Sequence, residues 1–202
     1  MDLSTKYLGF DLKNPIVAAA GPLTANLDTL KQLEDAGVAA AVLHSLFEEQ
    51  IAHEQSELDH HLEATSEIYA ESLSFFPAAD DYRLGPEQYL EHIRKAKASV
   101  GIPIIASLNG VSVGGWTDYA KKMQQAGADA IELNVYFVAA NASLSSRVVE
   151  SLYEDILKNV KGAVSIPVAV KLCPYFSAFA SIASRLDSAG ADGLVLFNRF
   201  YQ

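Results

Sequence analysis

The sequence predicts a parallel α/β fold, a (β/α)8 barrel of the TIM type, because two phrases recur along the chain. One phrase begins with Ala-Gly and ends with Leu, at Ala36–Leu43, Ala126–Leu133 and Ala189–Leu196. The other contains Ile-Pro and also ends with Leu, at Val100–Leu108 and Val164–Leu172. The later copies of each phrase lie roughly 63 residues apart, which indicates an array built from one repeating unit.

Both phrases have the same structural interpretation. A glycine that ends a helix accepts the left-handed conformation, and the short apolar run after it is typical of a parallel strand buried on both faces. We expect a single domain over residues 1–202. A closed barrel needs eight strands and typically about 250 residues. Only about six βα units can be recognised, so we expect an incomplete barrel; the alternative is a complete, open α/β domain.

The first half of the chain contains the elements up to the third strand. An extended hairpin is expected at Lys6–Pro15, before a strand at Ile16–Ala20 that Gly21-Pro22 breaks. Asn26 or Thr24 can cap the helix that follows, and Pro86 suits the first turn of a later helix. The other expected elements are the end of the first helix at Ala36, a strand at Ala39–Leu43, an acidic insertion over about residues 45–82, a helix from Gly85-Pro86 to Ser99, and a strand at Pro103–Leu108.

The second half alternates helices and strands without a large insertion. Each strand is a short apolar run that follows a helix-ending glycine or an Ile-Pro pair. The expected helices are Trp116–Ala126, Ser145–Lys161 and Ala178–Ala189, and the expected strands are Ala130–Asn134, Pro167–Leu172 and Gly193–Phe197.

Composition excludes several classes of function. The formal net charge of −10 and the pI near 4.9 disfavour nucleic-acid binding, because a phosphate-binding face needs clustered Lys and Arg. The single cysteine, Cys173, excludes an internal disulfide and fits a reducing cytosol. The start of the chain lacks the features of a signal peptide, and no stretch approaches the roughly 18 apolar residues that span a bilayer. We therefore expect a cytoplasmic protein with no membrane or nucleic-acid partner.

A histidine-rich stretch in the acidic insertion invites a zinc interpretation. His53-Glu54 begins an HExxH-like run, but the pattern would need a histidine where Glu57 stands. We therefore expect a solvated acidic helix face there and no metal site.

Candidate functional groups collect at the carboxyl ends of the strands, as they do in parallel α/β folds. Lys171 is the most informative, because a lysine that ends an apolar strand is costly to bury without a negative partner. An anionic reduced flavin, an enolate or a phosphate would serve; alternatively the ammonium reaches solvent at the barrel rim. The strand-end groups suit hydrogen bonding to a flat heterocycle, and they are Ala19, Ala20, Gly21, His44, Ser45, Ser107, Asn109, Asn134, Lys171 and Asn198.

Motifs at these strand ends resemble the dihydroorotate dehydrogenase family. They are NPIVAAAG, SLNG, ELN and VKLCPYF, in this order. LHSLFEEQ and SFFP are similar to segments of bacterial dihydroorotate dehydrogenase-like proteins. The resemblance covers the whole chain, and VKLxPYF is its most specific motif. It implies an FMN-binding barrel and an oxidoreductase of pyrimidine metabolism.

The resemblance also implies roles for individual residues. Backbone groups of Ala19, Ala20 and Gly21 would approach the FMN, and Ser45 and Asn134 would hydrogen-bond to it. Lys171 would lie near the pyrimidine edge of the flavin, where a cation stabilises the reduced anionic ring. The residues implied to bind substrate are Asn134, Asn198 and Ser72.

The chain departs from the family directly after the ELN motif. Where the family has Leu-Ser-Cys-Pro-Asn, this chain has Val135 to Ala139, and Phe137 cannot act as the base that the family's cysteine or serine provides. His44 replaces a flavin-contacting lysine and is a candidate for an acid/base or flavin-contacting role. Cys173 and Tyr136 are further candidates, with core packing as the alternative. We therefore expect oxidation of dihydroorotate to be very slow or absent.

Three functional hypotheses follow. The leading one is an FMN-dependent oxidoreductase that acts on CH–CH groups and transfers hydride between a small planar substrate and flavin. The second is a phosphate-handling lyase or isomerase without flavin, in which Lys171 is an electrophile or a Schiff-base amine. The third is a flavin-binding barrel that has lost its chemistry. The expected partners are a small-molecule substrate and, for the full-length protein, a second copy in a homodimer.

Overall fold

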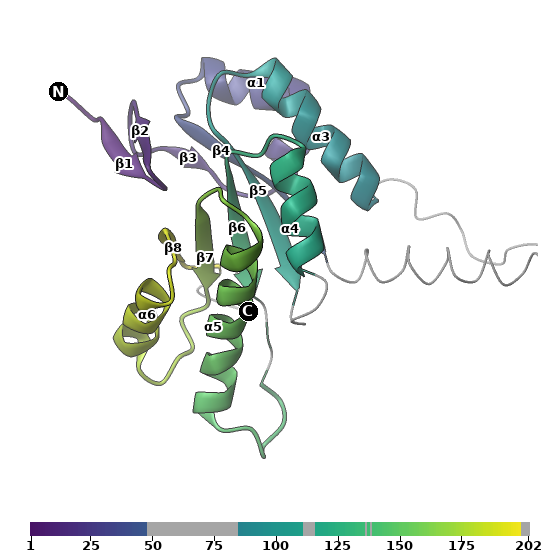
Figure 1. Ribbon diagram of the computed structural model, residues 1–202. Helices are drawn as coiled ribbons and strands as arrows, with labels where there is room; N and C mark the ends of the chain where they lie inside the picture. The colour runs from purple at the N-terminus through teal and green to yellow at the C-terminus, as the bar shows by residue number, and fades with distance from the viewer. Residues whose placement is uncertain (48–84, 111–115, 136, 138, 199–202) are drawn as a thin grey trace, which may run out of the picture.

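The centre of the molecule is a sheet of six parallel strands that pair in the order of the sequence. The structure is a computed structural model that describes residues 1–47, 85–110, 116–135, 137 and 139–198. The sheet curls into part of a barrel, with helices along one face (Figure 1). These observations confirm the parallel α/β fold. The strands are β3 (Val17–Ala18), β4 (Ala40–Phe47), β5 (Ile104–Gly110), β6 (Ala130–Val135), β7 (Val168–Leu172) and β8 (Gly193–Leu196).

The helices begin and end where local chemistry favours it. The Asn26 side chain accepts the backbone N–H of Asp28 at 2.8 Å, and Ser145 caps the long helix in the same way. Gly37, Gly127 and Gly190 adopt φ angles of 98°, 101° and 99° after three helices, as the repeated phrase predicts. The described helices are the 3-10 turn η1 (Pro22–Thr24), α1 (Leu27–Asp35), α3 (Pro86–Ser99), α4 (Trp116–Gln125), α5 (Ser146–Ala163) and α6 (Phe179–Ser188).

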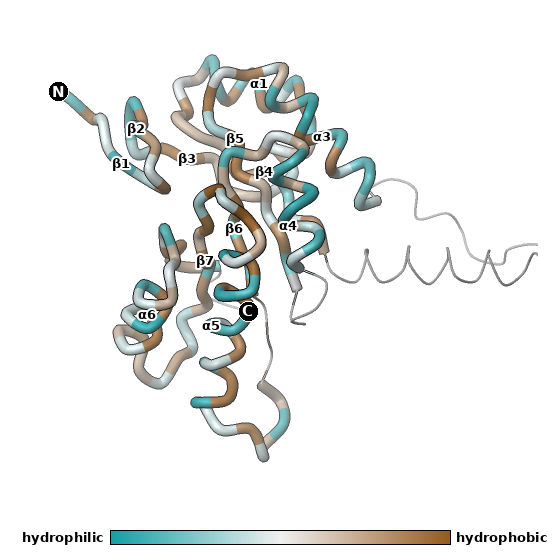
Figure 2. Tube along the Cα trace, viewed as in Figure 1, coloured by the Kyte–Doolittle hydropathy of each residue, from teal (hydrophilic) through white to brown (hydrophobic). Residues whose placement is uncertain are grey.

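Two hydrophobic clusters lie on opposite faces of the sheet. The larger cluster packs the helices against the outer face, and Figure 2 shows the hydrophobic strands at its centre. The smaller cluster lies on the inner face and includes Val42, Ile105 and Ala169. The expected hairpin is present as β1 (Thr5–Tyr7) and β2 (Phe10–Leu12), and it covers the inner face near the beginnings of the strands.

Strand β4 is longer than the sequence predicts. It continues past Leu43 to Phe47, because its pairing with β5 shifts register between Val42 and Ser45. At this bulge the Tyr89 hydroxyl accepts the N–H of Ser107 at 2.9 Å and donates to the same residue's carbonyl at 3.2 Å. The acidic insertion therefore does not begin at Ser45, and most of it lies outside the described residues. Strand β3, in contrast, is shorter than the predicted Ile16–Ala20.

Within the described part of the chain, no helix combines the length and the apolar character that crossing a bilayer requires.

Candidate functional site

Side chains alternate between the two faces along β5, β6 and β7. On the inner face they form two rows, in which five of the six side chains are polar. Asn109, Asn134 and Lys171 are partners in register, and we call them the mouth row because they lie nearer the carboxyl ends. Two residues earlier on each strand, and therefore on the same face, are Ser107, Glu132 and Ala169, which we call the inner row. The structure thus brings together Asn134 and Lys171, two of the residues that the sequence predicts at strand ends.

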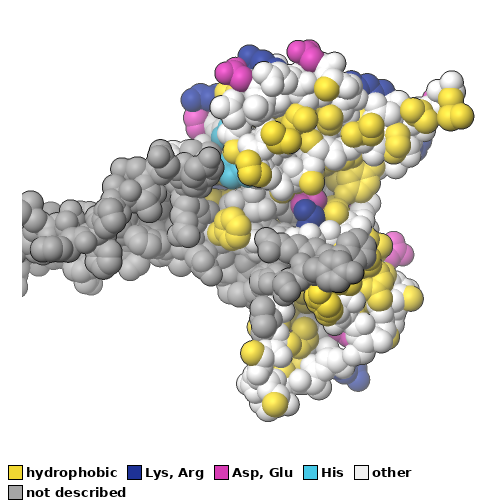
Figure 3. All heavy atoms as spheres, turned by 180° about the vertical axis from the view of Figure 1, so that it is seen from behind, with side chains coloured by type: hydrophobic (Ala, Val, Ile, Leu, Met, Phe, Trp, Pro, Cys, Tyr) yellow, Lys and Arg dark blue, Asp and Glu magenta, His cyan; other side chains and the backbone are white. Residues whose placement is uncertain are grey.

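A cavity of about 650 Å³ is lined by one member of each row, Lys171 of the mouth row and Glu132 of the inner row. Ala19 and Ala20 line it, together with Lys171 and Asn198, so four of the predicted site residues share one cavity. Figure 3 shows the molecule from behind, where the surface is hollowed and basic and acidic atoms lie together in the hollow. The hairpin also contributes to the lining, through residues that sequence reasoning did not select: Thr5, Lys6, Tyr7 and Leu12.

Lys171 meets a negative partner from the protein itself. Its Nζ lies 2.6 Å from Oε1 of Glu132, and the two side chains are only 11% and 3% exposed. Burial raises the pKa of Glu132, while the charge of Lys171 and the hydrogen bond to it act in the opposite direction. The same carboxylate acts on Tyr7, where burial first and Glu132 second raise the pKa to about 12. Lys171 therefore does not simply reach solvent at the rim.

Asn134 carries a buried polar atom that can receive a ligand. Its Oδ1 has no hydrogen-bond partner among the described residues, although the residue is only 8% exposed. A buried oxygen of this kind is costly unless a donor reaches it. The amide therefore suits a ligand that presents an N–H or O–H group at the mouth of the half-barrel.

Ser45 faces the same side of the sheet but already has a partner. Its hydroxyl lies 2.8 Å from that of Ser107, whose residue is fully buried. A hydroxyl can accept while it donates, so this pair can still bond to a ligand. The role of Ser45 in binding stays a prediction.

His44 packs against helix α3. Its ring lies 5.1 Å from that of Tyr89 and 5.5 Å from that of His92, measured between centroids. Burial first and the neighbouring His92 second lower the pKa of His44 to about 4, so its imidazole is neutral at neutral pH. The His92 ring is held in turn by a contact of 3.0 Å between its Nε2 and the carbonyl oxygen of Thr24. An acid/base role for His44 stays a prediction.

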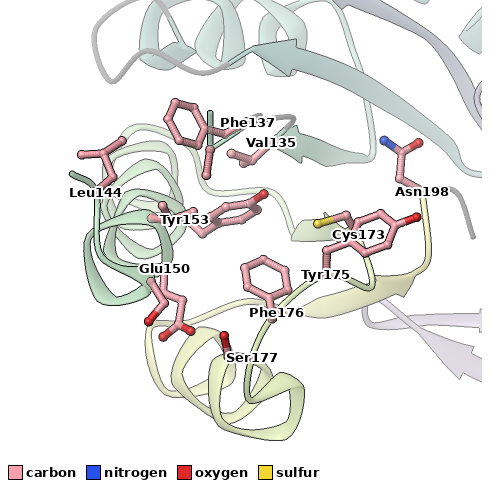
Figure 4. Close-up of a pocket in the computed structure, with 13 residues that line it drawn as sticks. Val135, Phe137, Leu144, Glu150, Tyr153, Cys173, Tyr175, Phe176, Ser177 and Asn198 are labelled. Atoms are coloured by element: carbon pink, nitrogen blue, oxygen red, sulfur yellow. The ribbon is translucent and has the colours of Figure 1, made fainter. Parts of the chain in front are cut away.

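A second cavity, of about 310 Å³, lies beside the ends of β6 and β7 (Figure 4). Tyr153 points into it from α5 toward Cys173, and its pKa is raised by burial first and by Cys173 second. Phe137 lines this cavity rather than the larger one, while Asn198 lines both. The cavity therefore adjoins the mouth of the half-barrel, and we call it the aromatic cavity because Phe137, Tyr153, Tyr175 and Phe176 all line it.

Sequence reasoning missed Glu132 and Tyr153. A signal for Glu132 was available, because a charged residue in the apolar strand Ala130–Val135 sits two positions before Asn134 and must share its face. Tyr153 gave no such signal, since an aromatic residue in an amphipathic helix is usually packed in the core. Nothing pointed to its meeting Cys173 at a strand end.

The remaining predicted positions differ in outcome. Gly21 has an extended backbone with φ 173°, and its carbonyl accepts two bonds from Thr24. Ser72 and Tyr136 lie outside the described residues. Over the part of the chain that the structure describes, no three His, Cys, Asp or Glu side chains gather in a way that could hold a metal ion.

The fold defines a class of protein: a parallel α/β fold of the barrel type, here with a cavity on the inner side of its sheet. The sequence pattern of the family described as dihydroorotate dehydrogenase matches residues 83–200. The chain therefore belongs to the dihydroorotate dehydrogenase family.

Individual relatives agree with this assignment. The catalytic subunit of dihydroorotate dehydrogenase B (NAD(+)) from Thermoplasma acidophilum is 33% identical over 199 residues, which is 98% of this chain and 62% of the relative. The corresponding subunit from Methanocaldococcus jannaschii is 30% identical over 97% of this chain and 62% of its own length. Dihydroorotate dehydrogenase A (fumarate) from Lactobacillus delbrueckii subsp. bulgaricus is 35% identical over 49% of this chain. The chain thus spans about 62% of the length of the B-type relatives.

A solved structure supports the fold alone. The crystal structure of phosphonopyruvate hydrolase aligns with a TM-score of 0.51 at 18% sequence identity, covering 91% of this chain and 58% of that protein. The alignment agrees with a barrel-type α/β fold of which the described strands form a part.

Proposed function

We propose that the full-length protein is an FMN-dependent oxidoreductase of the dihydroorotate dehydrogenase type. The observation that carries the proposal is the mouth row, where the buried unpartnered Oδ1 of Asn134 lies beside the lysine of the VKLCPYF motif. Membership in the family supplies the cofactor, and FMN supplies the capacity to accept or donate a hydride.

The residues of the larger cavity fit a flat heterocycle. The small side chains of Ala19 and Ala20 let a ring approach the backbone at the end of β3. Beside the cavity, Asn134, the register partner of Lys171, offers a hydrogen-bond acceptor that is already desolvated. Lys171 brings a positive charge into a wall otherwise rich in apolar side chains, where it interacts strongly with any charge that develops on a bound ring.

The substrate side of the site supports a small planar substrate. Asn134 and Asn198 are the amides at the mouth that we propose to orient it, and Asn198 also borders the aromatic cavity. Phe137 stands where the family's base is expected and cannot accept a proton. Cys173, just after β7, and Tyr153, on α5, line the same cavity as Phe137. We therefore propose a substrate other than dihydroorotate, with proton transfer served from this pair or from His44.

Flavin binding is the direct test. We expect the purified full-length protein to carry bound FMN, visible in its absorbance spectrum, and the Lys171→Gln variant to bind it more weakly. Lys158→Gln is the matched control, because Lys158 is an exposed lysine on α5 whose partner is Glu154. A full-length protein that neither retains nor takes up FMN would refute the proposal and favour the phosphate-handling hypothesis.

The substrate proposal needs a separate assay. Dihydroorotate and a panel of small planar reduced compounds would be tested for reduction of the bound flavin. NAD⁺ and fumarate, which occur in the relatives' names, would be tested as electron acceptors. We expect little or no turnover of dihydroorotate, because a positioned base typically contributes about 10²–10⁴-fold to the rate. Rapid dihydroorotate turnover would contradict this, and loss of that turnover in Cys173→Ser or His44→Phe would identify the base.

A further inference from the structure

The ion pair between Glu132 and Lys171 is an unusual feature of the cavity wall. Lys171 belongs to the mouth row and Glu132 to the inner row, so the lysine reaches diagonally back toward the strand beginnings to make a 2.6 Å contact. Apolar residues of the inner cluster, Val42, Ile105 and Ala169, surround the base of this pair. The ammonium is therefore held below the level of Asn134.

Burial makes each partner depend on the other. An isolated buried charge is strongly disfavoured, so removing one member of a buried pair leaves the other without compensation. Few other polar groups face the pair from the described elements. Tyr7 comes from the hairpin, Ser107 is engaged with Ser45, and Lys6 lines the outer part of the cavity. Glu132 is thus the principal counter-charge of Lys171.

We propose that Glu132 is a positioning residue that holds the Lys171 ammonium and offsets its charge, and thereby lowers the reduction potential of the flavin bound beside it. The inference rests on the proposed function. Two-electron reduction of FMN takes up two electrons and one proton, which leaves the ring with one additional negative charge. A lysine without a counter-charge would stabilise that anion fully, whereas a paired lysine stabilises it less.

Reductive titration of the full-length flavoprotein with dithionite tests the proposal. Glu132→Gln keeps the shape of the side chain and an acceptor for the ammonium but removes the negative charge. We expect the potential to shift positively, by an amount equal to about a tenfold gain in relative affinity for reduced flavin, or about 30 mV for a two-electron couple. Lys171→Gln should shift it negatively, and the double variant should resemble Lys171→Gln alone.

Glu154→Gln is the matched control, because it removes the same charge from α5, where Glu154 pairs with Arg185 and Lys158 outside the cavity. Its potential should equal that of the wild type. An unchanged or more negative potential in Glu132→Gln would overturn the inference. If Glu132→Gln does not fold, Glu132→Asp serves as the test. Its shorter carboxylate weakens the pair with Lys171 and should give a smaller positive shift of the reduction potential. An unchanged potential in Glu132→Asp would also overturn the inference.

The two proposals fail in different ways. A wild-type protein without flavin would remove the proposed function and, with it, the basis of this inference. A wild-type flavoprotein whose potential is insensitive to Glu132 would remove the inference and leave the proposed function standing.

Discussion

His44 and Lys171 are both polar residues withdrawn from water beside the same sheet, but their surroundings act on them in opposite ways. Lys171 has a carboxylate at 2.6 Å, so its charge is compensated. The ring contacts of His44 with described residues are to Tyr89 and His92, and burial followed by His92 lowers its pKa to about 4. One residue therefore supports charge in the cavity wall, while the other is kept neutral.

The environment of His44 predicts a pH dependence of stability. In the unfolded chain its imidazole takes up a proton near pH 6.5, whereas in the folded protein it does so only near pH 4. The unfolded state therefore binds more protons between these values, and the free energy of unfolding falls as the pH drops from 6.5 to 4. We expect this loss to be about 1–2 kcal/mol, since partial exposure of the ring reduces the full effect.

Chemical denaturation at pH 7, 5.5 and 4.5 measures how the free energy of unfolding changes with pH. His44→Phe keeps an aromatic ring against Tyr89 but cannot be protonated, so its stability should fall less than that of the wild type over this range. Comparing the two proteins cancels the titration of all other groups. If the free energy of unfolding fell equally in both proteins as the pH drops, His44 would not be responsible for the loss of stability.

At the scale of elements, an aspartate in each of two copies of the Ala-Gly phrase links a strand to a helix, and we call each of these links a clamp. Asp129 follows one helix-ending glycine, and its carboxylate accepts the N–H of Ile104 at 2.7 Å and contacts Lys97 Nζ at 2.7 Å. Asp192, at the equivalent place in the next copy, accepts the N–H of Val168 at 2.7 Å and contacts Lys161 at 2.6 Å. Each aspartate therefore ties the start of a strand to the helix before that strand.

Removing one clamp should destabilise the fold. Asp129→Ala leaves the N–H of Ile104 without its acceptor, and we expect the free energy of unfolding to fall by about 1–3 kcal/mol. Asp155→Ala is a suitable control, because Asp155 is an exposed aspartate on α5 and its replacement should change stability by less than about 0.5 kcal/mol. Urea denaturation monitored by circular dichroism compares the two. Equal effects would mean that the clamp does not contribute.

The hairpin depends on a glycine at the start of β8. A Cβ atom at Gly193 would lie 3.0 Å from Cδ2 of Leu8 and 3.1 Å from Cε2 of Tyr7. The absence of a side chain thus lets the hairpin approach the start of β8 closely.

A larger residue at this position should loosen the hairpin. Gly193→Val forces both neighbours to move, and we expect a loss of about 1–3 kcal/mol. Gly162→Val is the matched control, because a Cβ at that helical position meets no atom within 4 Å. Thermal unfolding of both variants tests this, and a Gly193→Val protein as stable as the wild type would contradict the packing argument.

At the scale of the whole molecule, the described sheet has two edges, β3 and β8. Strand β8 carries Leu196 with 52% of its surface exposed. An edge strand offers unpaired backbone groups, and an exposed apolar side chain on it favours pairing with another chain. The six-stranded sheet is thus a template for association.

We expect the 202-residue chain to self-associate in sedimentation velocity experiments and to retain FMN poorly. Leu196→Lys should shift the distribution toward monomer, because a lysine on an edge strand opposes pairing. Val148→Lys, at a residue of helix α5 that is 54% exposed, introduces the same charge away from β3 and β8 and should not. A monodisperse wild-type monomer that unfolds cooperatively would contradict the prediction.

Much of the architecture could be predicted from local chemistry. Asn26 and Ser145 indicate where helices begin, because their side chains accept backbone N–H groups. Gly37, Gly127 and Gly190 indicate where helices end, because glycine readily adopts a backbone conformation with positive φ. The rule that functional groups collect at the carboxyl ends of parallel strands also drew attention to Asn134 and Lys171, since both lie near the ends of buried strands.

Only the tertiary structure decided the electrostatics of the site. The pairing of Glu132 with Lys171 depends on the register between β6 and β7, which joins residues far apart in the sequence. The environment of His44 depends on a bulge, where one additional residue changes the face on which the following side chains lie. The sequence by itself thus determined which elements form and which polar groups reach the strand ends. Which of those groups are charged, neutral or unpartnered was decided by packing, because burial and the nearest opposing charge set the cost of every ion in the cavity.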